Sequence, residues 1–110
     1  MSSHDAAEVR VAFSDGLILR TVREGSERLR EAFAHGARVE IDCAAVTECD
    51  LSGAQLIVAA LKSAEQAGKQ VRLTPPTSGV LALTLSRAGL TEAYDELVAA
   101  CARGEGSIAQ

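Results

Sequence analysis

The spacing of apolar residues changes its period near the middle of the chain, and this change restricts the possible folds more than any other feature. Val39, Ile41 and Cys43 alternate with acidic residues, which predicts a strand with one buried face. From Ser52 onward the period is helical, which predicts a helix packed on a sheet; the apolar positions are Leu56, Ile57, Ala60, Leu61 and Ala64. A strand followed directly by a helix is the unit of an α/β fold.

The residues before this unit predict a β-hairpin and a helix. Alternating apolar residues over 9–13 are followed by the turn residues Ser14-Asp15-Gly16 and the apolar run 17–19, a pattern typical of two antiparallel strands. Thr21-Val22-Arg23-Glu24 fits a capping box, so a helix is expected to begin there and to end at His35-Gly36. Its mixed charges are those of a solvated helix face.

The residues after it predict a short strand and two more helices. The strand is expected over 70–73, the next helix begins after a polar cap, and the last helix is expected over 91–101. The residues that bound these elements are, in chain order, Gly68, Pro75-Pro76, the candidate caps Thr77 and Ser78, and Gly89-Leu90.

The predicted order is therefore β-β-α-β-α-β-α-α. Strand-helix-strand units place parallel strands in one sheet, so the sequence predicts an α/β fold with a mostly parallel or mixed sheet of four to five strands and about four helices. One domain is expected over residues 8–102, with flexible ends at 1–7 and 103–110.

Composition argues against several functions. The net charge is −4, the pI is about 5.1 and only three residues are aromatic, so a nucleic-acid-binding surface is not expected. The longest apolar runs, such as Leu56–Leu61, are far shorter than the roughly 18 residues of a membrane span, and the N-terminus lacks a signal-peptide core. We therefore expect a cytoplasmic protein that does not insert into membranes.

The cysteines and histidines do not form a recognisable site in the sequence. Cys43, Cys49 and Cys101 are odd in number and lack a Cys-x-x-Cys spacing, so they are expected to be reduced, and Cys43 and Cys49 are expected to lie in the core. His4 and His35 are isolated, which leaves no expected metal site, cofactor or nucleophile-base pair. An enzyme is accordingly not expected. A hard-cation site at Asp42, Glu48 and Asp50 is less favoured than a solvated strand and loop.

The segment Asp50-Leu51-Ser52-Gly53 is the candidate functional site. It lies in an expected loop, 47–53, at the carboxyl end of a strand, where open α/β sheets place functional residues. Ser52 is expected at a helix N-terminus, while Gly53 would let a partner's backbone approach and Leu51 would offer an apolar contact. Ser52-Gly53-Ala54-Gln55 also fits a capping box, so Ser52 could be a structural cap, a functional group or both.

Four features in order resemble the STAS domain family over roughly residues 9–98. They are the strand Val39-Glu40-Ile41-Asp42, the loop Asp50-Leu51-Ser52-Gly53, the helix end Glu65-Gln66-Ala67-Gly68-Lys69 and the later Arg87-Ala88-Gly89-Leu90. In the anti-sigma factor antagonists of this family, a partner kinase phosphorylates the Ser or Thr directly before the glycine, and Ser52 holds that position. Leu51 and Ala54 depart from the residues usual there, so the partner need not be an anti-sigma factor.

The resemblance implies a protein-binding module that is gated by phosphorylation of Ser52. The expected partner is a serine kinase or anti-sigma-factor-like protein, or another signalling or transport subunit. The loop is acidic and has no Arg or Lys nearby in sequence, so phosphate is expected to block docking by like-charge repulsion. The expected partner-binding residues are Glu48, Asp50, Leu51, Ser52, Gly53 and Gln55.

The alternative is a constitutive scaffold or adaptor subunit of a chemotaxis-like, lipid-transporter or anion-transporter assembly. In that case the same residues form a permanent interface and Ser52 is only a helix cap.

Overall fold

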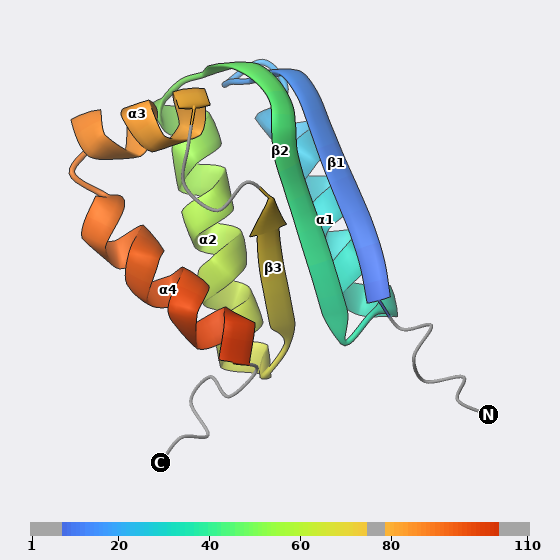
Figure 1. The fold of residues 1–110 in the computed structure, drawn as a ribbon. Coiled ribbons are helices and arrows are strands. Elements are labelled where there is room, and N and C mark those ends of the chain that lie inside the picture. The colour runs from blue at the N-terminus through green and yellow to red at the C-terminus, as the bar shows by residue number, and fades with distance from the viewer. Residues whose placement is uncertain (1–7, 75–78, 104–110) are drawn as a thin grey trace.

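The computed structural model describes residues 8–74 and 79–103. Three strands and four helices are present in this part of the chain, and Figure 1 shows the strands side by side with α1 behind them and α2 and α4 next to β3. The elements are β1 (Glu8–Leu17), α1 (Val22–His35), β2 (Arg38–Cys49), α2 (Leu51–Ala67), β3 (Gln70–Thr74), α3 (Gly79–Arg87) and α4 (Thr91–Arg103).

The sheet has the order β1-β2-β3, and both pairs of strands are parallel. Arg38 at the start of β2 is in register with Glu8 of β1 and Gln70 of β3. Parallel neighbours joined through helices confirm the α/β class. The described sheet has three strands, fewer than the four to five that the sequence predicted.

The missing strand is the second arm of the expected hairpin, and that prediction was wrong. β1 runs through Ser14-Asp15-Gly16 without reversing and stays paired with β2 as far as Leu17, which lies opposite Cys49. Asp15 has a positive φ of 62°, and the register shifts on both sides of it. An Asp tolerates this left-handed conformation, so the turn-forming residues make bulges in one long strand instead of a turn.

The two faces of the sheet differ in polarity. Val11, Ile41 and Leu73 are buried on the face that the helices cover. On the opposite face Arg10 pairs with Glu40 at 3.7 Å and also with Asp42, and Arg72 pairs with Glu40 at 3.5 Å. Exposed pairs of this kind stabilise a fold only slightly, so they identify the side of the sheet that meets solvent.

Helix α1 begins after Thr21 and ends at His35, as the sequence predicted, but the contacts at its start differ from the predicted ones. Thr21 occupies the N-cap position without a side-chain capping bond, because its hydroxyl bonds the Gly16 and Ile18 carbonyls and accepts from the Ile18 N–H. The predicted capping box is therefore absent. A Cβ at Gly25 would lie 3.0 Å from Leu56 Cδ2, so this glycine lets α1 pack closely against α2.

Glycines end two helices where the sequence placed the stops. Gly68 after α2 and Gly89 after α3 both have a φ of 72°, the left-handed conformation that glycine adopts without strain. The Leu90 N–H then donates to the Leu85 carbonyl at 2.8 Å, which closes the end of α3. The predicted caps Thr77 and Ser78 and the prolines before them lie outside the described residues. The expected flexible ends at 1–7 and 103–110 also lie outside them, except for Arg103, which is the last residue of α4.

All three thiols are free, and their surroundings differ. Burial raises the pKa of Cys43 to about 12 and that of Cys101 to about 11, whereas Cys49 is only half-buried and has its pKa raised by the same cause. The expectation of a core position is thus confirmed for Cys43, whereas Cys49 is only partly buried against the core; Cys101 is buried as well. A thiolate is the reactive form, so neither buried thiol is suited to nucleophilic chemistry.

A thiol reagent such as DTNB at pH 8 should therefore distinguish the cysteines. We expect Cys49 to react first in the folded protein, and Cys43 and Cys101 to react only as the protein opens. Reaction of the denatured protein gives the total number of thiols as a control. Equal rates for all three thiols under native conditions would contradict the burial described above.

Candidate docking site at the start of helix α2

Asp50 alone joins β2 to α2, and it caps the helix. Its carboxylate accepts from the Gly53 N–H at 3.0 Å and from the Leu19 N–H at 3.0 Å, while its carbonyl accepts from the Ala54 N–H. The first N–H groups of a helix lack partners within the helix, and a carboxylate there also complements the helix dipole. Asp50 therefore begins α2 and ties it to the segment after β1.

Two expectations about this segment were wrong. The expected loop over 47–53 is reduced to Asp50, because β2 extends to Cys49 and α2 begins at Leu51. Ser52 is not the N-cap, because Asp50 occupies that position and its carboxylate already accepts the Gly53 N–H. The capping box from Ser52 to Gln55 is consequently absent, and Ser52 lies in the first turn of the helix.

The hydrogen bonds to Asp50 also predict how stability depends on pH. Donation from the Leu19 N–H first, and the Gly53 N–H next, lowers the pKa of this carboxyl below its ordinary value of 3.8. A lowered folded-state pKa contributes stability that is complete above the unfolded value and is lost as the pH falls through the folded value. Asp50 thus stabilises the fold at neutral pH and ceases to do so in acid.

Asp50→Asn should therefore lower the melting temperature most at neutral pH. We expect the difference in Tm between wild type and variant to stay constant down to about pH 5 and to shrink below about pH 4. Thermal melts followed by circular dichroism between pH 2.5 and 7 measure it. Asp95→Asn, at an exposed position of α4, is the control. A difference as large at pH 3 as at pH 7 would contradict the assignment.

Gly53 has an internal role. It is buried, and a Cβ built on it would lie 1.9 Å from the Leu17 carbonyl oxygen. From the sequence, Gly53 was expected to let the backbone of a partner protein approach. In the structure it instead makes room for the chain's own strand β1. The absence of a side chain thus lets the start of α2 rest directly on the end of β1.

Ser52 lines a hollow between α1 and α2. The hollow has a volume of about 460 Å³; α1 contributes Arg23, Ser26, Glu27 and Arg30, and Ser52 and Gln55 lie opposite on α2. Ser52 is half-exposed, and its hydroxyl makes no hydrogen bond with any residue that the structure describes. The hydroxyl is therefore neither buried in the core nor committed to a capping bond.

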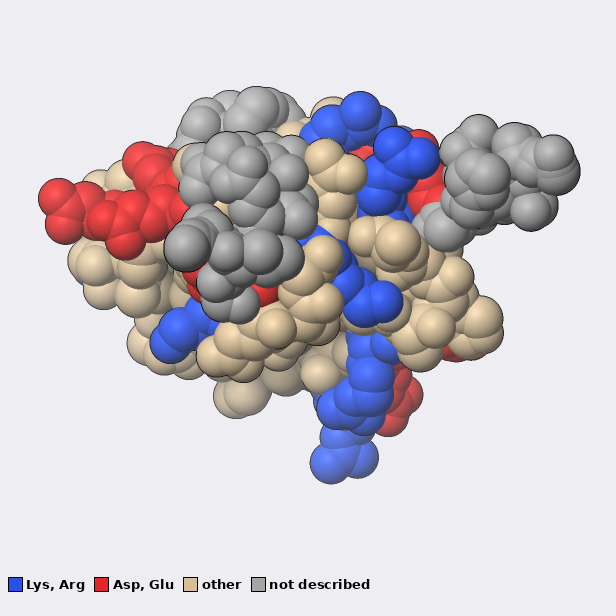
Figure 2. All heavy atoms as spheres, turned by 90° about the horizontal axis from the view of Figure 1, so that it is seen from below, with Lys and Arg blue, Asp and Glu red and all other residues tan. Residues whose placement is uncertain are grey.

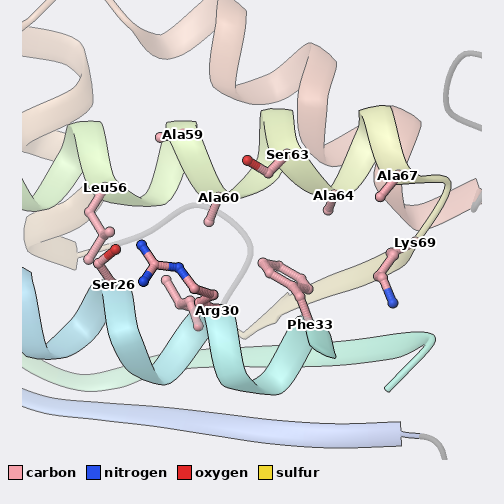
Figure 3. Close-up of a pocket in the computed structure, with 11 residues that line it drawn as sticks. Ser26, Arg30, Phe33, Leu56, Ala59, Ala60, Ser63, Ala64, Ala67 and Lys69 are labelled. Atoms are coloured by element: carbon pink, nitrogen blue, oxygen red, sulfur yellow. The ribbon is translucent and has the colours of Figure 1, made fainter. Parts of the chain in front are cut away.

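A groove continues from this hollow along the two helices. Figure 3 shows it between α1 and α2, with Leu56, Ala60 and Ala64 on the α2 side and Phe33 on the α1 side. Its volume is about 310 Å³, and it shares Ser26, Arg30 and Leu56 with the hollow. Lys69 lies at its far end, where its Nζ donates to the Gly36 carbonyl at 3.1 Å.

Three exposed leucines surround the junction between β2 and α2. Leu19 is 70% exposed, Leu51 is 50% exposed and Leu83 is 51% exposed. The Leu19 N–H bonds Asp50, Leu51 follows Asp50, and Leu83 precedes Thr84, whose hydroxyl donates to the Cys49 carbonyl at 3.0 Å. We call these residues the leucine surface; exposed apolar residues gathered in one place are typical of protein-binding sites.

The predicted site residues thus separate into two groups. Glu48, Leu51 and Gln55 are exposed, and Asp50 and Ser52 are half-exposed, so all five are open to solvent at one end of the domain. Gly53 alone is buried.

Sequence reasoning missed the α1 side of the site and two of the three leucines. The spacing of Arg23, Ser26 and Arg30 at i, i+3 and i+7 already predicts one helix face, but no local pattern indicates that this face lies opposite Ser52.

The charges of the domain are unevenly distributed. Figure 2 shows the end of the molecule opposite the leucine surface, where Lys and Arg side chains cross the middle of the face and the largest group of Asp and Glu lies at one edge.

Within residues 8–74 and 79–103, no group of three or more His, Cys, Asp and Glu side chains is arranged to hold a metal ion. None of the helices described is long and apolar enough to cross a bilayer.

Comparison with known protein families gives a match over most of the chain. A family model described as "Mlab, STAS domain" matches residues 1–103, nearly the whole chain. The comparison with curated proteins gives no match.

Proposed function

The chain belongs to the STAS domain family, and we propose that it is a protein-binding module whose docking is switched off when Ser52 is phosphorylated. The observation that carries the proposal is the state of Ser52, which is a half-exposed residue and whose hydroxyl makes no hydrogen bond among the described residues. It lies beside Leu51, at the edge of the leucine surface.

The leucine surface supports docking of another protein. Leu19, whose N–H bonds the Asp50 carboxylate, and Leu51, which follows Asp50, are both exposed, so apolar side chains and a carboxylate are presented together. Apolar side chains of a partner that cover these leucines remove them from water, and burial of one leucine side chain is worth about 1.5–3 kcal/mol. Glu48 and Gln55 provide polar groups at the edge of the same surface.

The capping role of Asp50 supports modification of Ser52. A serine that caps a helix has its hydroxyl engaged with backbone N–H groups, whereas here the carboxylate of Asp50 accepts the Gly53 N–H. Phosphorylation would add about −1.5 to −2 charges next to the docking surface. The kinase is a separate protein, and the partner is a kinase, an anti-sigma-factor-like protein or another signalling or transport subunit.

The proposed module binds and does not catalyse. Ser52 has no hydrogen-bonded base in the part of the chain that is described, and burial raises the pKa of the thiols of Cys43 and Cys101 well above neutrality. Three free thiols suit the reducing conditions of the cytoplasm, which we propose as its location.

Affinity capture from the native cytosol tests the switch. Wild type and Ser52→Ala are expected to retain the same partner, identified by mass spectrometry, and Ser52→Glu is expected to lose it by a factor of about ten or more, since one desolvated like charge costs at least ~1.4 kcal/mol. Gln66→Glu also adds a negative charge at an exposed position of α2, away from the groove, and is the matched control. Equal retention by wild type and Ser52→Glu would refute the phosphorylation switch.

The exposure of three leucines in the structure of the chain alone favours a second candidate function. A constitutive scaffold subunit of a chemotaxis-like or transporter assembly would keep the three leucines covered at all times, as obligate interfaces do. A stable stoichiometric complex that survives Ser52→Glu but is lost in Leu51→Asp would support this candidate.

A further inference from the structure

We infer that a phosphate group on Ser52 is bound within the same chain by the guanidinium groups of Arg23 and Arg30. The inference rests on the proposed phosphorylation of Ser52 and names what the modified residue contacts. It assigns the hollow between α1 and α2 as a phosphate-binding site that lies beside its own acceptor.

The two helices present complementary faces to this hollow. Arg23, Ser26 and Arg30 follow one another at i, i+3 and i+7 and therefore share one face of α1. Ser52 and Leu56 are four residues apart and share one face of α2. Since both sets line one hollow, the hydroxyl and the two arginines face the same space.

The helices approach each other closely beside Ser52. A Cβ at Gly25 would lie 3.0 Å from Leu56 Cδ2, so α1 touches α2 one helical turn after Ser52 and at the residue before Ser26. In Figure 3 the side chain of Arg30 extends from α1 toward α2, and its guanidinium lies beside Ser26 and Leu56. A phosphate on Ser52 would thus enter a space that arginine side chains already border.

Arg23 and Arg30 are also available for a new partner. Both are exposed, and neither has an ion pair or hydrogen bond with any residue in the described ranges. Arg28 on the same helix is engaged, since it donates to the Ala12 carbonyl at 2.8 Å and its guanidinium lies 5.0 Å from the centre of the Phe13 ring. A guanidinium binds two phosphate oxygens at once, which makes arginine the favoured phosphate ligand.

The charged groups around the acceptor favour binding of a phosphate. Arg23 and Arg30 face the hollow from α1 together with one carboxylate, Glu27, and Asp50 precedes α2. Inside the hollow, two positively charged arginines therefore outnumber one negatively charged glutamate, although the residues next to Ser52 in sequence are acidic or neutral. This arrangement replaces the expectation of simple repulsion, because much of the added charge would be neutralised within the chain.

The inference explains how modification could block docking without new repulsion. A phosphate held by Arg23 and Arg30 occupies part of the hollow, next to Leu51 of the leucine surface, and engages two guanidinium groups that could otherwise pair with a partner's carboxylates.

The test uses the full chain with phosphoserine installed at position 52 during translation, so that no kinase is needed. The second pKa of the phosphate is measured by phosphorus NMR in 0.15 M salt. It is expected about one unit below the value of about 6 for free phosphoserine. Arg23→Gln and Arg30→Gln should each raise the phosphate pKa part of the way back to about 6, and the double variant should raise it most of the way. Glu27→Gln should lower the pKa further.

Arg38→Gln is the matched control, because Arg38 is an exposed arginine at the opposite end of β2. Circular dichroism confirms that each variant is folded. A phosphate pKa near 6 that ignores the arginine substitutions would overturn the inference. A lowered pKa that persists in the double variant would assign the effect to the helix N-terminus and would overturn it too.

The same samples separate this inference from the proposed function. If the arginines lower the pKa but the phosphorylated chain still binds its partner, the switch fails and the phosphate site stands. If the phosphorylated chain loses its partner while the pKa stays near 6, the switch stands and the phosphate site fails.

Discussion

Gly53→Ala is expected to lower the free energy of unfolding by more than about 4 kcal/mol or to prevent folding altogether. The new Cβ would lie 1.9 Å from the Leu17 carbonyl oxygen and 2.8 Å from the Leu17 carbonyl carbon. Both are backbone atoms, so no rotamer change relieves the clash. To make room, α2 must move away from β1, which would break the 3.3 Å bond from the Asp50 N–H to the Leu17 carbonyl.

Urea denaturation followed by circular dichroism measures this loss. Gly16→Ala is the matched control, because the nearest atom to its Cβ would be a side-chain carbon of Ile18 at 3.4 Å, an ordinary contact. We expect that control to change the free energy of unfolding by less than about 1 kcal/mol. A Gly53→Ala variant as stable as Gly16→Ala would show that α2 and β1 are not in contact as described.

Tyr94→Ala is expected to destabilise the fold by about 3–5 kcal/mol, the range found when a buried large aromatic residue is removed. Tyr94 is 0% exposed and is the largest of the fully buried side chains among the described residues. Its helix α4 packs against α2 and β3. The variant leaves a cavity that aliphatic neighbours cannot fill. The loss is a large part of the roughly 5–15 kcal/mol that stabilises a typical domain.

Chemical denaturation of Tyr94→Ala and of Glu96→Ala provides the comparison. Glu96 is exposed on the same helix, so its replacement should change the free energy of unfolding by no more than about 0.5 kcal/mol. Equal stability of the two variants would mean that α4 contributes little to the core.

The location of the candidate site could be predicted from sequence, but its internal geometry could not. The change of period after Cys43 placed a strand-to-helix junction near residue 50, and the residues around it carried the family resemblance. Which residue caps the helix depended on where β2 ends and on the Leu19 N–H, which belongs to a segment 31 residues away from Asp50. Local spacing alone favoured Ser52, and the longer-range bond favoured Asp50.

The N-terminal hairpin shows the same limit. Ser14-Asp15-Gly16 has the residues of a tight turn, and local preference indicated a reversal of the chain. Parallel pairing of β1 with β2 continues past these residues and buries Leu17, so the positive φ of Asp15 makes a bulge in one strand. The burial of Leu17 depends on contacts that a turn pattern does not contain.

The sequence by itself determined the α/β class, the positions of the helices and the glycines that end two of them, because each depends on spacing or backbone conformation within a few neighbouring residues. Only the tertiary structure decided that Gly53 rests on β1, that the leucine surface gathers around Asp50, and that Arg23 and Arg30 face Ser52. These contacts join residues far apart in the chain. They follow from the packing of the helices on one sheet, and the sequence pattern of a single segment does not contain that information.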